Sequence, residues 1–262
     1  MSDGKWWDVS WNPIVGCTRC SPACEHCWAL RMAATRLRHL PQYQGMTYDR
    51  KYTDEHGQTR TRADWTERRP RPTGQSVPGG KGKLVFVCDM SDLFLAYMQI
   101  IHGVFDTMEE HIEHTFAMLT KRPETMAAVF RHRYWGEQRP PVHIWAGVSV
   151  WDQASLERAM AAFEKLPYST MRYISYEPAL GPINLRAAET DVAFTGLPRW
   201  VIAGAETGPG ARPANLDWFR DVLNWCCLTV PPVPFWLKQV DARRERELDG
   251  QEWNQRPEVK HD

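Results

Sequence analysis

The chain has 262 residues, of which 43% are hydrophobic, and it carries 32 Lys and Arg residues against 32 Asp and Glu residues. A chain of this length can bury a sizeable core, and α/β barrels of this size are commonly one domain, which we expect for residues 1–240. The zero net charge excludes a protein-wide basic field that would attract nucleic acid, although a local basic patch stays open.

The N-terminal region contains a run of four cysteines: Cys17, Cys20, Cys24 and Cys27. Residues 7–15 before them are rich in β-branched and aromatic side chains and predict a short buried strand, after which Gly16 lets the backbone turn. After them, apolar residues recur at helical spacing, at Trp28, Met32, Ala33, Leu37 and Leu40. The cysteines are therefore predicted to lie in a loop between a strand and a helix. In a parallel sheet such a loop lies at the carboxyl ends of the strands, where α/β folds collect their chemistry.

Three interpretations of the four thiols compete. Zinc ribbons usually hold two C-x-x-C pairs far apart, whereas here only three residues separate Cys20 from Cys24. The spacing Cys20-x3-Cys24-x2-Cys27 is that of the radical S-adenosylmethionine (SAM) enzymes, in which three thiolates leave one iron of a 4Fe-4S cluster open to bind SAM. The third interpretation is a cluster of free or disulfide-bonded cysteines. No secretory signal or long apolar run opens the chain, so we expect a cytoplasmic protein with no membrane partner. Disulfides are disfavoured in the cytoplasm. An iron-sulfur site is the preferred interpretation.

A longer motif surrounds the cysteines, namely Trp11-Asn12-Pro13-x-x-Gly16-Cys17-Thr18-x-x-Ser21-Pro22-x-Cys24-x-x-Cys27-Trp28-Ala29. Further segments of the same kind are residues 87–94, 114–123, 147–149, 177–182 and 204–213. Together they resemble the phage-associated, radical-SAM-like proteins described by a three-cysteine motif, over nearly the whole chain. This resemblance implies a partial TIM-like (β/α) barrel of the radical SAM type.

The resemblance and the spacing differ on the first cluster ligand. The thiols that the family pattern holds in common correspond to Cys17, Cys24 and Cys27, whereas the spacing alone favours Cys20 in place of Cys17. Both cannot bind if one iron is to stay open. All four cysteines are therefore candidate metal ligands, and the resemblance favours Cys17, with Cys20 as a spare thiol at the rim.

Strand and helix signals alternate after residue 82. Strands are predicted at 83–88, 114–120, 142–148, 171–175, 200–204 and 234–238. One helix is predicted to end at residue 113, and two more are predicted over 154–166 and 216–227. With the strand before the cysteines, this makes about six or seven parallel strands, in an open sheet or a partial barrel.

Polar residues follow the predicted strands and should converge on one rim of the sheet. The candidate catalytic residues are Lys121, Glu177 and Glu206. The candidate cofactor-binding residues are Ser91, Asp92, Arg122, Ser149, Gln153 and Gly204.

If SAM is the ligand, each of its parts has candidate partners. Ser91 and Asp92 are assigned to its ammonium, and Lys121 or Arg122 to its carboxylate. Ser149 and Gln153 are assigned to the ribose, and the turn from Gly204 to Gly208 to the adenine. For the acidic residues Asp92, Asp152 and Asp217, capping of a helix is an equal alternative. His26 is expected to pack beside the cluster rather than bind it.

The function that follows is that of a radical SAM-type iron-sulfur enzyme. It would cleave SAM reductively to a 5′-deoxyadenosyl radical that abstracts hydrogen from a substrate, with a nucleic-acid base as one candidate and an external flavodoxin or ferredoxin as electron donor. The alternative is a non-enzymatic zinc-binding or adaptor protein that uses the four-cysteine loop structurally.

Two further segments are predicted to be polar. Residues 41–82 are interrupted by Pro and Gly and read as a long insertion, which beside an active site often serves as a lid or substrate arm. The preferred interpretation is a solvated connection, and the alternative is phosphate binding by five arginines around Trp65: Arg60, Arg62, Arg68, Arg69 and Arg71. Residues 241–262 are predicted to be a charged C-terminal tail and a second cover for the site.

Overall fold

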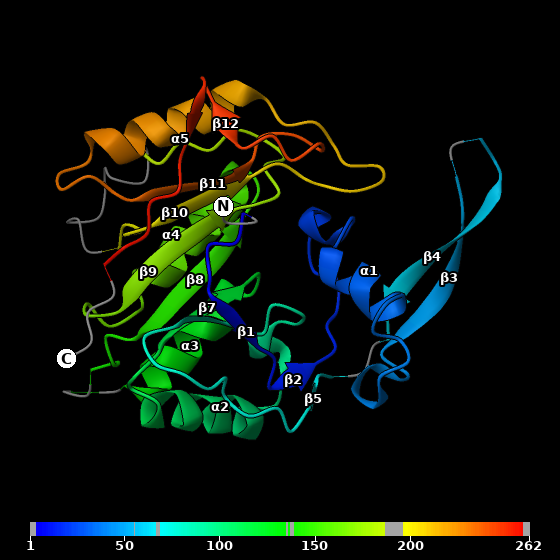
Figure 1. The fold of residues 1–262 in the computed structure, drawn as a ribbon, viewed down its shortest axis with the longest axis horizontal. Helices are drawn as coiled ribbons and strands as arrows, with labels where there is room; N and C mark the ends of the chain where they lie inside the picture. Colours follow the sequence, from blue (N-terminus) through cyan, green and yellow to red (C-terminus); the bar gives the residue numbers. More distant parts are fainter. Residues whose placement is uncertain are drawn as a thin grey trace.

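The computed structural model describes residues 4–54, 56–66, 69–134, 136, 139–186 and 196–258. Within these ranges, seven strands form one sheet in which every neighbouring pair is parallel and the strands follow one another in chain order. The strands are β1 (Val9–Trp11), β6 (Leu84–Val87), β7 (Thr115–Thr120), β8 (Ile144–Val150), β9 (Met171–Tyr176), β10 (Val201–Gly204) and β11 (Phe235–Gln239). The sheet is a half-barrel with β1 and β11 at its edges, which confirms the predicted mixed α/β fold with a parallel sheet (Figure 1).

The outer face of the sheet is covered by helices. Alternate strand residues such as Val85, Phe116 and Ile174 pack into one large core with the apolar faces of these helices. The helices are α2 (Met98–Glu110), α3 (Pro123–Arg133), α4 (Gln153–Phe163) and α5 (Leu216–Leu228). Of the predicted helix starts, Asp152 caps α4, Asp92 caps a short 3-10 helix (Leu93–Leu95), and Asn215 rather than Asp217 caps α5.

The inner face of the sheet changes from apolar to polar along the strands. Near the amino ends of the strands, the four tryptophans Trp6, Trp145, Trp200 and Trp236 pack with Tyr173 into a separate cluster. Two or four residues further along the same strands, the alternation brings polar side chains to this inner face, among them Ser149, Ser175 and Lys238. The aromatic cluster thus closes the bottom of the half-barrel and leaves the polar chemistry at the carboxyl ends.

The predicted first strand is divided in two. β1 ends at Trp11, and after Pro13 the chain turns into β2 (Ile14–Val15), which pairs antiparallel with β5 (Arg71–Pro72). Pro13 has a fixed φ and no N–H with which to continue a ladder, and it lies where the chain leaves the edge of the sheet. The helix after the cysteines, α1 (Trp28–Ala34), is shorter than the predicted apolar periodicity to Leu40.

The insertion is more regular than predicted. Instead of a structureless loop, it contains an antiparallel hairpin of β3 (Thr47–Thr53) and β4 (Thr59–Trp65). With α1 this hairpin buries a core of its own, built around Leu30, Tyr43 and Trp65. Figure 1 shows α1 and the hairpin standing to one side of the half-barrel, and we call residues 28–66 the arm.

The C-terminal segment is also folded rather than free. A small hairpin of β12 (Glu247–Leu248) and β13 (Gln251–Glu252) leads into Trp253, whose carbonyl accepts a hydrogen bond from Leu237 N at 2.8 Å. The Arg256 guanidinium pairs with Asp8 at 2.9 Å. The segment therefore borders the edge strand β11, and the last predicted tail residues, 259–262, lie outside the described residues.

Candidate functional site

A cavity of about 130 Å³ lies where the cysteine loop meets the carboxyl ends of β6, β7 and β8. All four cysteines of the loop line it, as the sequence predicted for a shared site. The opposite wall is made by five of the predicted ligand-binding or catalytic residues: Ser91, Asp92, Lys121, Arg122 and Ser149. The parallel sheet therefore brings together residues that are more than a hundred positions apart in the chain.

The four thiols differ in their surroundings. Cys17, Cys24 and Cys27 are half-buried and Cys20 is exposed, and all seven cysteines of the chain, which lie within the described ranges, are free thiols. Burial, followed by the charge of Asp92, raises the pKa of Cys17 to about 12. The pKa of Cys24 is lowered by a hydrogen bond from the Cys20 thiol and, against its burial, by the nearby Lys121 ammonium. Cys24 is thus the thiol most easily ionised, and the thiolate is the form that binds metals.

The four thiols are soft donors that line one cavity. Among the described residues, no group of three or more His, Cys, Asp or Glu side chains is already arranged to hold a metal ion. A tetrahedral zinc site would need sulfur atoms only about 3.8 Å apart, from a Zn–S bond of about 2.3 Å. Soft thiolates are the ligands of both zinc sites and iron-sulfur clusters, so the chemistry of the donor set is compatible with either.

Asp92 is the centre of a hydrogen-bond network behind the cysteines. Its buried carboxylate accepts hydrogen bonds from the Thr120 hydroxyl at 2.7 Å, from Lys121 N at 3.1 Å and from the Arg122 guanidinium at 2.9 Å. Arg122 also donates to the carbonyl and the hydroxyl oxygen of Thr18, at 3.1 Å and 2.8 Å, in the cysteine loop. Asp92 and Arg122, predicted to bind opposite ends of SAM, are therefore paired with each other and fix the loop on the sheet.

Lys121 is the cation left for a ligand. Its side chain lines the cavity, and its ammonium makes no hydrogen bond or ion pair within the part of the chain that the structure describes. Burial acts to lower its pKa, but the charges of Cys24, Cys27 and Asp92 outweigh burial and raise the pKa above its usual value. A protonated ammonium therefore faces the thiols at neutral pH.

Glu177 lies on the inner face beyond this cavity. Its carboxylate accepts from Lys238 Nζ at 2.7 and 2.8 Å and from Gln239 Nε2 at 3.0 Å. A Cβ at Gly204 would lie 2.9 Å from the Gln239 amide nitrogen and 3.3 Å from the Glu177 carboxyl, so this position must be small. The absence of a side chain at Gly204 therefore makes room for Glu177. In the ion pair of Glu177 with Lys238, each side chain is about one-fifth exposed.

Glu206 joins the loop after β10 to the cysteine loop. Its buried carboxylate accepts from Arg212 Nε at 2.9 Å, and Arg212 also donates to the carbonyl of Pro22 at 3.0 Å. His26 Nε2 lies 4.0 Å from Glu206, and a Cβ at Gly210 would come within 2.9 Å of the His26 ring. Glu206 and His26 therefore pack the two loops together.

The remaining predicted residues have separate positions. Gln153 does not line the cavity. At the start of α4, its amide oxygen accepts a hydrogen bond from Asn184 N at 2.7 Å, and its amide nitrogen donates to the Glu157 carboxylate at 3.2 Å. Ser91 donates to Ile14 O at 3.3 Å and still lines the cavity.

The predicted phosphate-binding arginines are divided as well. Arg71 donates to the carbonyls of Pro41, Gln42 and Gln44, and Arg69 donates to Leu95 O and lies over the Tyr97 ring. Both hold the base of the insertion together, Arg60 and Arg62 lie on the arm, and Arg68 falls outside the described residues.

Several residues that line the cavity were not predicted for it, among them Thr18, Arg19, Trp65 and Cys88, whereas Asp89 was expected at this rim. Cys88 has φ of 62°, an uncommon conformation for a residue other than glycine, and forms the turn that ends β6. Asp89 accepts from Ser10 and Asn12, both at 2.6 Å. The signal for Asp89 was its place directly after a strand, the same signal that identified Ser91 and Asp92.

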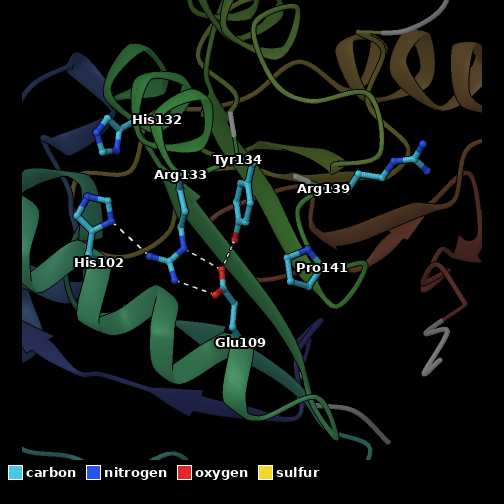
Figure 2. Close-up of a pocket in the computed structure, with 7 residues that line it drawn as sticks. All are labelled: His102, Glu109, His132, Arg133, Tyr134, Arg139 and Pro141. Atoms are coloured by element: carbon cyan, nitrogen blue, oxygen red, sulfur yellow. Dashed lines mark hydrogen bonds and ion pairs between the residues drawn. The ribbon is translucent and has the colours of Figure 1, made fainter. Parts of the chain in front are cut away.

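A larger pocket of about 590 Å³ lies on the outer side, between α2 and the end of α3. Figure 2 shows Glu109 of α2 facing Arg133 and Tyr134, with His102 on the other side of the guanidinium. The Arg133 charge is neutralised by Glu109 and Asp106. None of the predicted site residues lines this pocket, so it does not share in the site at the carboxyl ends of the strands.

Residues 1–257 match the sequence model of a family described as "Protein of unknown function (DUF5131)", so the chain belongs to this family. No curated protein matches the chain, and no solved structure matches it. Separately, no helix of the described residues has the length and apolar character needed to cross a membrane.

Proposed function

We propose that this member of the DUF5131 family is a radical SAM-type iron-sulfur enzyme. The observation that carries the proposal is one cavity at the carboxyl ends of a parallel half-barrel, lined by four free thiols and by Lys121, whose ammonium has no hydrogen bond or ion pair among the described residues. Three thiols of Cys17, Cys20, Cys24 and Cys27 would hold a 4Fe-4S cluster and leave one iron open for SAM. When bound, this cluster supplies the electron that cleaves SAM reductively, and the electron would come from a flavodoxin or ferredoxin.

The exposure of the thiols supports Cys17 over Cys20 as the first ligand. Cys17, Cys24 and Cys27 are all half-buried in the cavity, whereas Cys20 is exposed at its rim. A cluster surrounded by protein is shielded from solvent, so the three half-buried thiols are the better set.

The residues of the chain would divide the remaining tasks. Lys121 offers an ammonium to the SAM carboxylate, and the hydroxyl of Ser149, which makes no hydrogen bond within the described ranges, faces the same cavity. Asp92 and Arg122 hold the cysteine loop in register with the sheet. Glu177 and Lys238, further along the inner face, are placed for a substrate.

The test is anaerobic reconstitution with iron and sulfide, followed by metal analysis and electron paramagnetic resonance of the reduced protein with and without SAM. We expect about four irons per chain, a signal that changes when SAM is added, and 5′-deoxyadenosine as a product. About one zinc per chain with no cluster would remove the proposal and support the structural zinc alternative.

Matched cysteine variants make the test specific to the loop. Cys24→Ala should abolish SAM cleavage and lower the iron content, because it removes a ligand from the cavity. Cys227→Ala is the control, because Cys227 is an exposed thiol on α5 that does not line the cavity. Cys17→Ala and Cys20→Ala then identify the first ligand, because only the ligand variant should lose the cluster.

A further inference from the structure

The charges of the chain are divided unevenly between residues 17–72 and the rest of the sequence. Residues 17–72 contain eleven Lys and Arg against six Asp and Glu, so the other residues carry the balancing excess of acid. Between Glu25 and Asp49 the sequence contains no acidic residue. The zero net charge of the whole chain therefore conceals a basic N-terminal segment beside the cysteine cavity.

The arm presents this charge on an exposed sheet surface. In the β3–β4 hairpin, Tyr48 pairs with Asp64, Arg50 with Arg62, and Tyr52 with Arg60, and this alternation puts all six side chains on one face. Tyr48 is 46% exposed and Tyr52 is 38% exposed. The opposite face contributes Ala63 and Trp65 to the core of the arm, whereas the face with tyrosines and arginines carries the aromatic and cationic side chains together.

Several cations of the arm have no carboxylate of their own. Arg50 reaches Asp64 only at 3.5 Å, because Asp64 is already bound by Arg19 at 2.8 Å. Within the described residues, Arg36, Arg38 and Lys51 form no ion pair and are exposed. Arg50 also lies directly opposite Arg62, so two guanidinium groups stand side by side on this face.

The other cations on this face are held by exposed ion pairs that a phosphate can displace. Arg60 pairs with Asp54 and Arg62 with Glu25, and the arginine side chains in these pairs are 56% and 32% exposed. Such pairs are worth little in water. The base of the same hairpin reaches the cavity, because Trp65 and Arg19 both line it. A strand lying along the arm would therefore lead to the cysteine site.

From this surface we infer that the arm binds single-stranded nucleic acid, with Arg50, Arg60 and Arg62 at its phosphates and with Tyr48 and Tyr52 stacked on its bases. The two tyrosines are four residues apart on one strand, about 13 Å, with Arg50 between them, and alternation of aromatic and cationic side chains is the pattern of single-strand binding surfaces. A duplex keeps its bases stacked, so it cannot use the tyrosines in this way. This inference stands apart from the iron-sulfur chemistry, because it concerns binding alone.

The experiment is fluorescence anisotropy of the full-length protein with labelled 20-nucleotide DNA and RNA single strands and with a duplex of the same DNA sequence, without SAM. We expect a single strand, DNA or RNA, to bind tighter than the duplex. For about four phosphate contacts, the plot of log affinity against log salt should have a slope of about −3.

Two matched variants locate the site. Arg50→Glu with Arg60→Glu should weaken binding at least tenfold and reduce the salt slope by about 1. Arg131→Glu with Lys165→Glu changes the net charge by the same amount at exposed positions on and after the helices of the outer face, and should leave binding nearly unchanged. Tyr48→Ala with Tyr52→Ala should weaken single-strand binding by about fivefold or more, because the stacking of a base on each tyrosine ring is lost.

Circular dichroism and the melting temperature show whether each variant is folded, and these exposed positions should tolerate the changes. No binding to any of the oligonucleotides at 50 mM salt, tighter binding of the duplex, or equal losses in the arm and control variants would overturn the inference. None of these outcomes depends on the cluster, so the radical SAM proposal can fail or stand independently.

Discussion

At the scale of single residues, the site is determined by which charges are already paired. Asp92 and Arg122 bind each other and the cysteine loop, so their charges stabilise the protein itself. Lys121, between them in the network, donates only its backbone N–H to Asp92 and keeps its ammonium in the cavity. A half-buried cation that makes no hydrogen bond or ion pair among the described residues is a candidate ligand-binding group.

Lys121→Met tests this assignment. Loss of a hydrogen bond to a charged group is worth about 1.5–3 kcal/mol, so we expect the dissociation constant for SAM to rise at least tenfold in the reconstituted protein. Calorimetry or the SAM-dependent change in the electron paramagnetic resonance signal measures it. Lys165→Met, at an exposed position, is the control. Unchanged SAM affinity in Lys121→Met would show that another group binds the carboxylate.

At the scale of elements, the arm depends on one partly buried ion pair where it joins the cysteine loop. Burial acts to raise the pKa of Asp64, but hydrogen bonding and the charge of Arg19, with the Trp65 N–H, outweigh it and hold the pKa below the ordinary 3.8. A lowered pKa in the folded state means that this stabilisation is present at pH values above 3.8. It is lost as the pH falls further and the folded carboxylate takes up a proton.

Asp64→Asn should therefore reduce the stability of the arm at pH 7. We expect a loss of about 1–3 kcal/mol, read as weaker hydrogen-exchange protection of β3 and β4. The difference from the unmodified protein should shrink below about pH 4, where Asp64 itself becomes neutral. Asp217→Asn is a suitable comparison, because Asp217 forms an exposed pair with Arg220 and its loss should change little. A difference that persists at low pH would mean that charge is not the cause.

At the scale of the whole molecule, the half-barrel is closed at its bottom by large side chains packed against small ones. A Cβ at Gly147 of β8 would lie 2.2 Å from the Tyr173 ring, which is held across the inner face by a hydrogen bond from its hydroxyl to Met118 O at 2.7 Å. The ring has little freedom to move, since it also packs against Trp6 and Trp200. Glycine at 147 is therefore required by the packing of the sheet.

Gly147→Ala should lower the free energy of unfolding by about 1–3 kcal/mol, the usual effect of overpacking a core. Urea denaturation followed by circular dichroism measures it. Gly103→Ala in α2 is the matched control, because a Cβ there meets no atom within 4 Å, and the helix should gain about 0.5–1 kcal/mol. If the two variants had equal stability, the close contact at Gly147 would not be a constraint on the fold.

The sequence by itself determined the parallel α/β fold, the alternation of its strands and helices, and the gathering of the cysteine loop with Ser91, Lys121 and Ser149 at one end of the sheet. These follow from local periodicity and from the rule that strand ends in a parallel sheet share an edge, so no knowledge of long-range contacts is needed. The four thiols were recognisable because their spacing is itself a local pattern.

Only the tertiary structure decided which of these residues keep their charge for a ligand. Asp92 meets Arg122 and Thr120 across about thirty positions of sequence, and Gln153 turns away to Asn184 across a similar distance. The tertiary structure also decided that much of the predicted solvated connection is a folded arm, because β3 and β4 are stabilised by a core shared with α1. Such pairings depend on three-dimensional proximity, to which local sequence patterns give no access.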